Sequence, residues 1–224
     1  MRNILTSTLL SVLLITGCST DGKKDVAPTP KQEDNCSKSD SMPMPMVVKK
    51  PAIYLYPKSE QKIDVKLKID GKIIKTIPKY GKNGWSVIVD SSGIIDNKYD
   101  YLFYENTLNT ITLPKEGWVK EYSELNGFFN KTLKELGLNQ KESKQFIEYW
   151  LKTLKKDKIY EIKLLSRDFL DKHMQLNISP KPDTTIRVIF SFKEANKKYS
   201  LKEPILTKPK RVGFVALEWG GIVQ

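Results

Sequence analysis

Residues 62–70 read KIDVKLKID and alternate strictly between polar and apolar side chains. Successive side chains of a β-strand point to opposite faces, so this period of two predicts a strand with one buried face and one solvated face. The Asp70-Gly71 pair that follows suits the left-handed backbone angles of a type I′ turn. We therefore expect a β-hairpin in which Ile73 and Ile74 continue as the partner strand.

Further strands are predicted on both sides of this hairpin. A continuous apolar run at residues 52–56, closed by Pro57, is typical of a buried strand. Large apolar residues predict two more strands at 85–89 and 99–104, and glycine-containing turns flank the first of these two. Residues 50–115 are thus expected to form a compact antiparallel β unit.

The pattern changes to a helical spacing from about residue 123. Gly137 is expected to end the first helix. Asn139, followed three residues later by Glu142, predicts a capping box at the start of a second helix. The turn between the helices is very short, so they should pack antiparallel as a helical hairpin over about 123–156. The predicted apolar face of the second helix comprises Phe146, Ile147, Trp150, Leu151 and Leu154.

Strand patterns resume after the helices, at residues 159–165, 174–178, 185–192 and 212–219. The chain shows no regular alternation of strand and helix, which argues against a parallel α/β fold. We therefore predict an α+β fold for residues 49–224. It is a single domain built on a mainly antiparallel β-sheet or sandwich, with the helical hairpin inserted between its halves.

The N-terminus has the pattern of a secretory signal peptide over residues 1–17. A positively charged start at Arg2 precedes an uncharged, mostly apolar stretch that is too short to cross a membrane. The ending Ile15-Thr16-Gly17-Cys18 resembles the bacterial lipobox, in which the cysteine is lipidated, with acyl chains such as palmitate, and the signal is cut just before it. The hypothesis is an exported lipoprotein anchored to the bacterial membrane by Cys18. The alternative is an ordinary signal peptide with a chance cysteine.

Residues 18–48 are predicted to be a flexible tether that follows the lipidated Cys18. The segment is rich in proline and polar residues, which cannot bury enough surface to offset the entropy of ordering. Cys36 has no partner cysteine if Cys18 carries lipid. It is then an idle thiol or one that pairs between chains.

The formal charge of +12 comes from lysines spread over the whole chain. A diffuse positive field favours anionic partners, namely lipid head groups, cell-wall polymers or acidic glycans. The predicted partners are therefore the membrane and an anionic envelope polymer or an envelope protein. The export signal argues against nucleic acid. The alternative is that the charge only keeps the surface soluble.

Several motifs resemble a family of uncharacterised exported bacterial proteins. They run in order from about residue 50 to 221: KPAIYLYP at 50–57, YLFYE at 101–105 and EWGG at 218–221. The chain departs from the family's usual residues at Tyr104, where tryptophan is more common. The resemblance implies one domain over this span. It supplies no catalytic residues, because the family has no known activity.

Glu105 and Glu218 are the candidate catalytic residues. Each ends an apolar strand beside an aromatic residue, Tyr104 or Trp219, and these two aromatics are the candidate ligand-binding residues. A glycosidase needs two carboxylates near a sugar that stacks on an aromatic ring. The alternative is that each glutamate pairs with a lysine or an arginine, such as Arg187 or Arg211, and only stabilises the sheet. A set of tyrosines could also line a glycan or peptide groove: Tyr54, Tyr56, Tyr80, Tyr99 and Tyr101, together with Trp118.

No metal site or cofactor is predicted. His173 is the single histidine, and the predicted domain has no cysteine to ligate zinc with it. The chain also lacks the G-x-S-x-G motif of serine hydrolases. We expect a non-enzymatic binding or structural module for another envelope component. The alternative is a carbohydrate-active hydrolase that uses the Glu105 and Glu218 pair.

Overall fold

The computed structural model describes residues 46–224, and Cys18, Cys36 and nearly all of the predicted tether lie outside these residues. The strands are β1 (Met46–Tyr56), β2 (Gln61–Ile69), β3 (Ile73–Ile77), β4 (Trp85–Val89), β5 (Leu102–Leu108), β6 (Trp118–Glu121), β7 (Ile159–Leu164), β8 (Met174–Ser179), β9 (Thr184–Ala195) and β10 (Val215–Val223). The helices are the short 3₁₀ helix η1 (Tyr122–Glu124), α1 (Leu125–Glu135), α2 (Gln140–Thr153) and α3 (Arg167–His173). Strand β1 begins three residues before the predicted domain boundary at residue 49.

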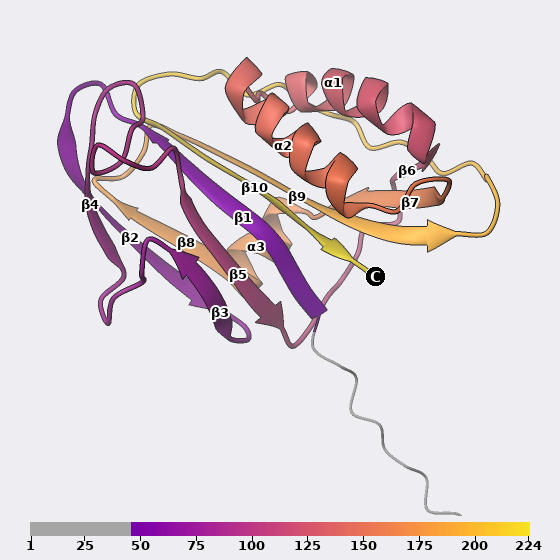
Figure 1. The fold of residues 1–224 in the computed structure, drawn as a ribbon, viewed down its shortest axis with the longest axis horizontal. Coiled ribbons are helices and arrows are strands. Elements are labelled where there is room, and N and C mark those ends of the chain that lie inside the picture. Colours follow the sequence, from indigo (N-terminus) through magenta and orange to yellow (C-terminus); the bar gives the residue numbers. More distant parts are fainter. Residues whose placement is uncertain (1–45) are drawn as a thin grey trace, which may run out of the picture. The chain divides into compact units, whose positions relative to one another are not determined.

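The strands form two sheets. The larger sheet has the order β3-β5-β1-β10-β9-β7-β6, and the smaller one has the order β4-β2-β8. Strands β9 and β10 pair in parallel, whereas the other paired strands run antiparallel. The two helices α1 and α2 lie on one side of the larger sheet, and β2, β4 and β8 lie on the other (Figure 1). The predicted α+β fold with an inserted helical hairpin is confirmed.

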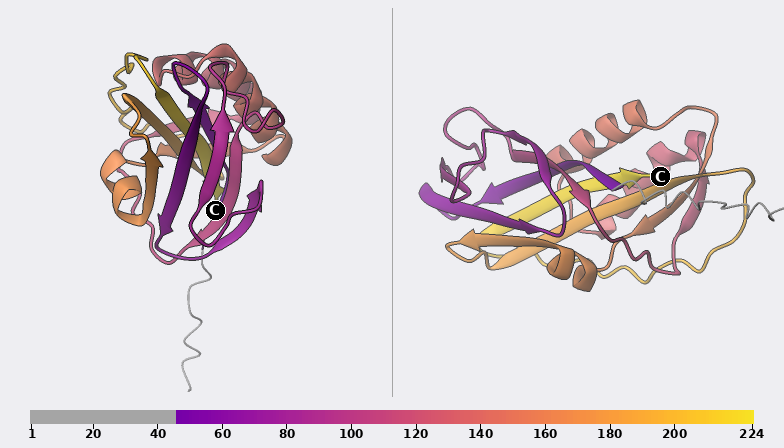
Figure 2. Two further views of the ribbon diagram at one scale, coloured as in Figure 1. Left: turned by 90° about the vertical axis from the view of Figure 1, so that its left-hand side faces the viewer. Right: turned by 90° about the horizontal axis from the view of Figure 1, so that it is seen from below.

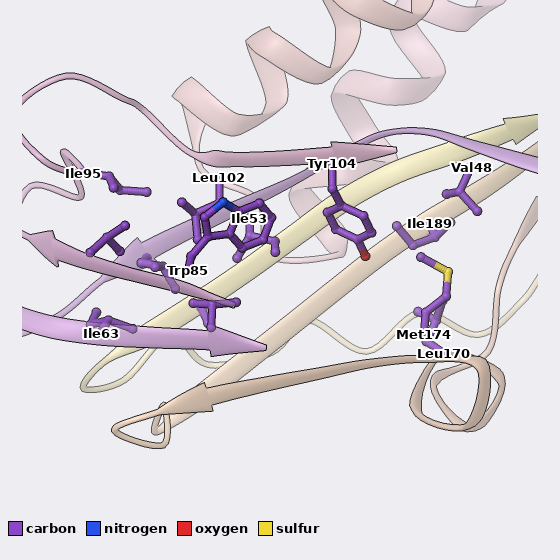
Figure 3. Close-up of a cluster of buried hydrophobic side chains, with 14 of the residues drawn as sticks. Val48, Ile53, Ile63, Trp85, Ile95, Leu102, Tyr104, Leu170, Met174 and Ile189 are labelled. Carbon is purple, nitrogen blue, oxygen red and sulfur yellow. The ribbon is translucent and has the colours of Figure 1, made fainter. Parts of the chain in front are cut away.

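The larger sheet is therefore the middle of three layers, with α1 and α2 behind its central strands in the view from below (Figure 2). Ile53 of β1 belongs to the hydrophobic cluster between the two sheets, part of which is drawn in Figure 3. The next residue, Tyr54, belongs to the cluster beneath the helices. A strand buried on both faces needs a continuous apolar run, whereas a strand of an outer layer alternates. This difference explains why residues 52–56 are continuously apolar while β2 alternates.

The helical hairpin packs on the sheet as the sequence predicts. Asn139 Oδ1 accepts a hydrogen bond from Glu142 N (2.9 Å), and Glu142 Oε2 accepts one from Asn139 N (2.7 Å), which completes the predicted capping box. Trp150 of α2 is fully buried. Its ring lies so close to β10 that a Cβ at Gly221 would be 2.6 Å from Trp150 Cζ2. Gly221 thus permits a close approach of the helix to the strand.

The predicted hairpin between residues 62–70 and Ile73-Ile74 is wrong. Strand β2 pairs with β4 and β8 in the smaller sheet, whereas β3 pairs with β5 at the edge of the larger one. The Asp70-Gly71 pair is a crossing between the two layers. A Cβ at Gly71 would lie 2.0 Å from the carbonyl oxygen of Thr107, so glycine is required here by the close approach to β5. A turn signal in the sequence does not show which neighbouring strand passes so close to the glycine that a side chain would clash.

The antiparallel unit predicted for residues 50–115 is divided in the same way. Its strands belong to two different sheets, and strands from the C-terminal half complete both of them. Strand β5 runs over Leu102–Leu108, later than the predicted 99–104. Strand β6 and helix α3 were not predicted, because four and seven residues are too short to show a clear period.

Candidate ligand-binding cleft

Strand β1 is interrupted by a bulge at Lys50-Pro51. Its pairing register shifts between Lys49 and Ala52 against β10, and between Val48 and Ala52 against β5. Proline cannot donate a hydrogen bond to a neighbouring strand, so within a sheet it is confined to edges and bulges. Lys50 has a φ of 56°, a left-handed conformation that is uncommon for lysine. Bulges of this kind re-aim a side chain, and this one sets the direction of Lys50.

The ammonium group of Lys50 lies among three aromatic rings. Its Nζ is 4.5 Å from the ring centre of Tyr101, 4.8 Å from that of Phe103 and 5.8 Å from that of Tyr149. It also donates a hydrogen bond of 2.6 Å to the Tyr101 hydroxyl. A cation within about 6 Å of a ring centre is attracted by the negative face of the ring. Lys50 is therefore held by the aromatic groups around it.

These side chains line a cleft with a volume of about 440 Å³, which we name the Lys50 cleft. That volume lies within the range of about 300–1,000 Å³ typical of small-molecule sites. The lining residues are Lys50, Lys75, Ile77, Lys98, Tyr99, Asp100, Tyr101, Phe103, Glu105 and Tyr149. The cleft combines aromatic faces with several charged side chains, which is the composition of a polar-ligand site.

Besides β1, which carries Lys50, three further elements bring the cleft together. Tyr101, Phe103 and Glu105 alternate along the chain into β5, so their side chains project from the same face of the larger sheet. Tyr149 reaches the cleft from α2, and Lys75 reaches it from the edge strand β3. Burial raises the pKa of Tyr149 above its ordinary value. The cleft thus lies on the helix-covered face of the sheet, over strands β3 and β5.

Asp100 fixes one wall of the cleft to α2. Its Oδ1 is 2.6 Å from Lys141 Nζ, and its Oδ2 accepts a hydrogen bond of 3.2 Å from Gln145 Nε2. The hydrogen bond from Lys141 lowers the pKa of Asp100, with burial acting in the opposite direction. Gln145 Oε1 in turn accepts a hydrogen bond of 2.7 Å from the buried hydroxyl of Tyr54. This chain of contacts ties the loop before β5 to the helix.

The cleft is positively charged. Lys50, Lys75 and Lys98 line it, against the carboxylates of Glu105 and Asp100. Asp100 is neutralised by Lys141. Three lysines then face one free carboxylate, which favours an anionic ligand.

The structure does not bring Glu105 and Glu218 together. Glu105 lines the Lys50 cleft on the helix-covered face of the larger sheet. Glu218 contacts Tyr104, whose ring belongs to the cluster on the opposite face, between the two sheets. The carboxylate that shares the cleft with Glu105 is Asp100. The pair that the hydrolase hypothesis requires is therefore not formed.

Glu218 instead takes part in a buried polar network. Its Oε2 accepts a hydrogen bond of 2.7 Å from Arg187 Nε, and the two side chains are 0% and 1% exposed. Its Oε1 accepts a bond of 2.5 Å from the hydroxyl of Tyr104, and Figure 3 shows this tyrosine projecting from β5 into the space between the sheets. Burial and the Glu218 charge raise the pKa of Tyr104. Pairing with Arg187 is the alternative that the sequence left open for this glutamate.

The two candidate ligand-binding aromatics are core residues. Tyr104 and Trp219 are both completely buried, and Trp219 Nε1 donates a hydrogen bond of 3.2 Å to the Tyr54 hydroxyl. Of the tyrosines proposed for a groove, Tyr99 and Tyr101 line the Lys50 cleft. The structure thus places these two tyrosines in the same cleft as Glu105.

His173 contacts a loop carboxylate. Its Nδ1 lies 2.8 Å from Asp70 Oδ2, which joins α3 to the end of β2. Within residues 46–224 there is no group of three or more histidine, cysteine, aspartate or glutamate side chains arranged to hold a metal ion. In the same residues, no helix has both the length and the apolar character needed to cross a membrane.

Comparisons with known proteins find no match: no family profile, no curated protein and no solved structure is similar to the chain. The resemblance to exported bacterial proteins therefore stays a prediction.

Seven of the ten cleft residues were not predicted from the sequence, and Lys50, Lys75 and Tyr149 are among them. The Lys49-Lys50-Pro51 run was the available signal, because it interrupts a strand that is otherwise apolar. Tyr149 precedes the buried Trp150 in the sequence, and nothing in its spacing shows that it lies at the edge of the packed face. Lys75 is one of many exposed lysines and had no distinguishing pattern.

Proposed function

We propose that the protein is a lipid-anchored cell-envelope protein whose domain binds an acidic polysaccharide of the envelope through the Lys50 cleft, without catalysing a reaction. In this proposal residues 1–17 direct export, and lipidated Cys18 holds the protein at the membrane. One observation carries the binding role: a strand bulge holds the Lys50 ammonium among three aromatic rings in a cleft that two further lysines line.

The ligand class follows from the two kinds of group in the cleft. Aromatic faces such as those of Tyr101 and Tyr149 stack on apolar faces of flat or puckered rings. The ammonium groups of Lys75 and Lys98 attract carboxylate or phosphate substituents. A polymer of acidic sugars offers both features in each repeat. The overall charge of +12 adds a long-range attraction to such a polyanion.

A carbohydrate-active hydrolase remains the alternative, with Glu105 beside Asp100 in the cleft rather than Glu218. The geometry gives this alternative little support. Both oxygens of Asp100 are engaged by Lys141 and Gln145, and its lowered pKa keeps it ionised, so it is not available as a proton donor. Release of reducing ends from the bound polymer would establish hydrolysis.

Binding of the purified protein to polygalacturonate tests the proposal. The comparison polymers are neutral dextran, which has sugar rings without charge, and polyglutamate, which has charge without sugar rings. We expect polygalacturonate to bind most tightly and dextran not to bind. Affinity should fall as salt is added, because the charged contacts are screened.

Variants locate the binding site. Tyr149→Ala should weaken polygalacturonate binding about tenfold, equivalent to about 1.4 kcal/mol, and Lys75→Ala with Lys98→Ala should act in the same direction. The matched controls are Tyr199→Ala and Lys66→Ala, which change exposed residues outside the cleft. Equal losses in the cleft and control variants would mean that only the overall charge binds the polymer. If polyglutamate bound as tightly as polygalacturonate, the aromatic rings would have no role in binding.

A further inference from the structure

The smaller sheet has an outer face that is exposed. This sheet lies on the opposite side of the larger sheet from α1 and α2 (Figure 1). Its inner side chains, among them Ile63 and Val65 of β2, belong to the cluster between the two sheets. Side chains of a strand alternate between its two faces, so the intervening residues point outward. We name these outward residues the lysine face: Lys62, Asp64, Lys66 and Lys68 of β2, Ser86 and Ile88 of β4, and Gln175, Asn177 and Ser179 of β8.

The lysines of this face have no carboxylate opposite them. Their cross-strand partners are neutral: Ile88 opposite Lys62, Asn177 opposite Lys66 and Gln175 opposite Lys68. A carboxylate in these positions would stabilise the strand pairs, because opposite charges attract across a sheet. Within residues 46–224 none of the three lysines forms an ion pair. The face thus carries three cations and one carboxylate, Asp64, and its ammonium groups can meet anions from outside the domain.

The sheet places these charges in a row on one surface. Each residue of a strand advances the chain by about 3.3 Å, so Lys62 and Lys68 lie about 20 Å apart along β2. Lysine has a long and flexible stem, which lets the ammonium groups of the row reach a common plane. Ile88, which is 44% exposed, adds an apolar side chain next to Lys62. A row of cations with an exposed apolar side chain fits an extended surface rather than an enclosed ligand.

We propose that the lysine face docks on the head groups of anionic phospholipids at the surface of a bilayer, where Lys62, Lys66 and Lys68 contact the phosphates. The negative surface potential of such a bilayer attracts lysines that lie close to it. A bilayer also matches the face in shape, because its phosphates lie in a plane above an apolar layer that an isoleucine can approach.

This docking face is separate from the Lys50 cleft. No residue of the lysine face lines the cleft. The cleft lies on the helix-covered side of the larger sheet, whereas the smaller sheet lies on the other side (Figure 1). A domain docked through the lysine face therefore presents the Lys50 cleft away from the bilayer. The inference does not rest on the polysaccharide-binding role, and either can fail without the other.

Co-sedimentation with lipid vesicles tests the inference. The purified Cys18→Ser protein is used, so that no acyl chain at this position contributes to binding. We compare vesicles of phosphatidylcholine mixed with anionic phosphatidylglycerol with vesicles of phosphatidylcholine alone. Binding to the anionic vesicles should be about tenfold tighter, and added salt should reduce the difference. Equal binding to the two kinds of vesicle would overturn the inference.

Two triple variants with the same loss of charge locate the contact. Lys62→Gln, Lys66→Gln and Lys68→Gln together should weaken binding to the anionic vesicles about tenfold. The control carries the same substitution at three exposed lysines outside the lysine face, namely Lys131, Lys134 and Lys208. It should change binding less than about threefold, because these lysines lie away from the docked surface. All six side chains are exposed, so both variants should fold, which urea unfolding checks. Equal losses would show that only net charge attracts the protein and would overturn the docking face.

A gain of binding gives an independent check. Asp64→Asn removes the one carboxylate of the lysine face and should strengthen binding to the anionic vesicles about threefold. Glu135→Gln, at an exposed residue of α1, makes the same change of charge elsewhere and should have a smaller effect. Equal effects of the two substitutions would contradict a contact at β2.

Polygalacturonate separates a bilayer site from a general polyanion surface. The triple variant at Lys62, Lys66 and Lys68 should bind this polymer as the unmodified protein does, because the Lys50 cleft is intact. If it lost polymer binding as strongly as vesicle binding, the assignment to a bilayer would be wrong. Failure of the unmodified protein to bind polygalacturonate would overturn the polysaccharide-binding role and leave the vesicle result unchanged.

Discussion

Tyr104 and Glu218 are joined by a hydrogen bond of 2.5 Å between strands that are not neighbours in the sheet. Tyr104 lies on β5 and Glu218 on β10, with β1 between them. Glu218 also accepts a hydrogen bond from Arg187 on β9, the next strand along. One buried carboxylate thus links three strands of a four-strand segment. A buried charge is tolerated when all of its partners are in place, and this network meets that condition for Glu218.

Replacing Glu218 by glutamine should therefore destabilise the protein strongly. The variant keeps the shape of the side chain but leaves the buried Arg187 charge with only its longer contact of 3.4 Å to Asp171. Loss of one partner of a buried ion pair costs about 3–5 kcal/mol. Urea unfolding, followed by tryptophan fluorescence, measures the loss. Glu148→Gln is the matched control, because Glu148 forms an ion pair 3.9 Å long with Lys144 at 63% exposure. Its effect should be below about 1 kcal/mol. A similar effect of the two substitutions would contradict the structural role of the buried pair.

Trp150→Ala should lower the free energy of unfolding by about 3–5 kcal/mol, because it empties a fully buried site between α2 and β10. Gly221→Ala should also destabilise, since its Cβ would lie 2.6 Å from Trp150 Cζ2 and 2.9 Å from the Phe190 carbonyl oxygen. In the Trp150→Ala background the first clash is gone, so Gly221→Ala should cost less than it does alone. A double-mutant cycle in urea measures this coupling. Additive effects would mean that the ring and the strand do not contact each other.

The fold class could be predicted from the sequence because its period changes twice, from strand to helix and back. The partner of each strand could not. The alternation at residues 62–70 predicted which face of this strand is buried. It does not indicate that the strand pairs with β8, which lies more than 100 residues away in the sequence. The Asp70-Gly71 pair correctly indicated a glycine with positive φ. This glycine does not close a hairpin, however; it allows the chain to pass close to Thr107 of β5. Pairing between distant strands is decided by burial in three dimensions, which local patterns do not contain.

The candidate site was predicted only in part. Glu105 and Tyr101 were identified because strand-end carboxylates and tyrosines are unusual enough to notice. Glu218 has the same sequence surroundings as Glu105, and the structure gives it the opposite face and an arginine partner. The difference arises from which face of the sheet each residue occupies, and that depends on the pairing register between strands that are distant in the sequence. The bulge at Lys50 illustrates the point, because it shifts the pairing register of the central strand on both sides.

The proposed lipid anchor at Cys18 makes a direct prediction. Cys18→Ser should prevent lipidation, since serine lacks the thiol that carries the lipid. The protein should then leave the membrane fraction or accumulate as an uncut precursor. Membrane fractionation with mass spectrometry of the N-terminus measures both outcomes, and Cys36→Ser is the matched control that should behave like the unmodified sequence. A Cys18→Ser variant that still fractionates with membranes at the mature mass would disprove the lipobox interpretation.

The link between Asp100 and α2 predicts a dependence of stability on pH. Asp100 has a lowered pKa, mainly because Lys141 donates a hydrogen bond to it. Its folded pKa is therefore below the unfolded value of about 3.9. A carboxylate of this kind stabilises the folded state fully above its unfolded pKa, and the contribution is lost as the pH falls through the folded pKa. The expected effect is small, about 0.2–1 kcal/mol, because the Asp100 side chain is 42% exposed and the pair is screened by solvent.

Urea unfolding at intervals from pH 7 to pH 2.5 measures this contribution. Asp100→Asn should be less stable than the unmodified protein by a constant amount above about pH 5, and the difference should shrink below about pH 4. In a Lys141→Met background, Asp100→Asn should have almost no effect, because the partner that lowers the pKa is absent. Glu60→Gln is the control: Glu60 is exposed and forms no ion pair within residues 46–224. A pH-independent difference between Asp100→Asn and the unmodified protein would show that the pair with Lys141 does not form in solution, and the cleft wall next to Tyr101 would then be free to move.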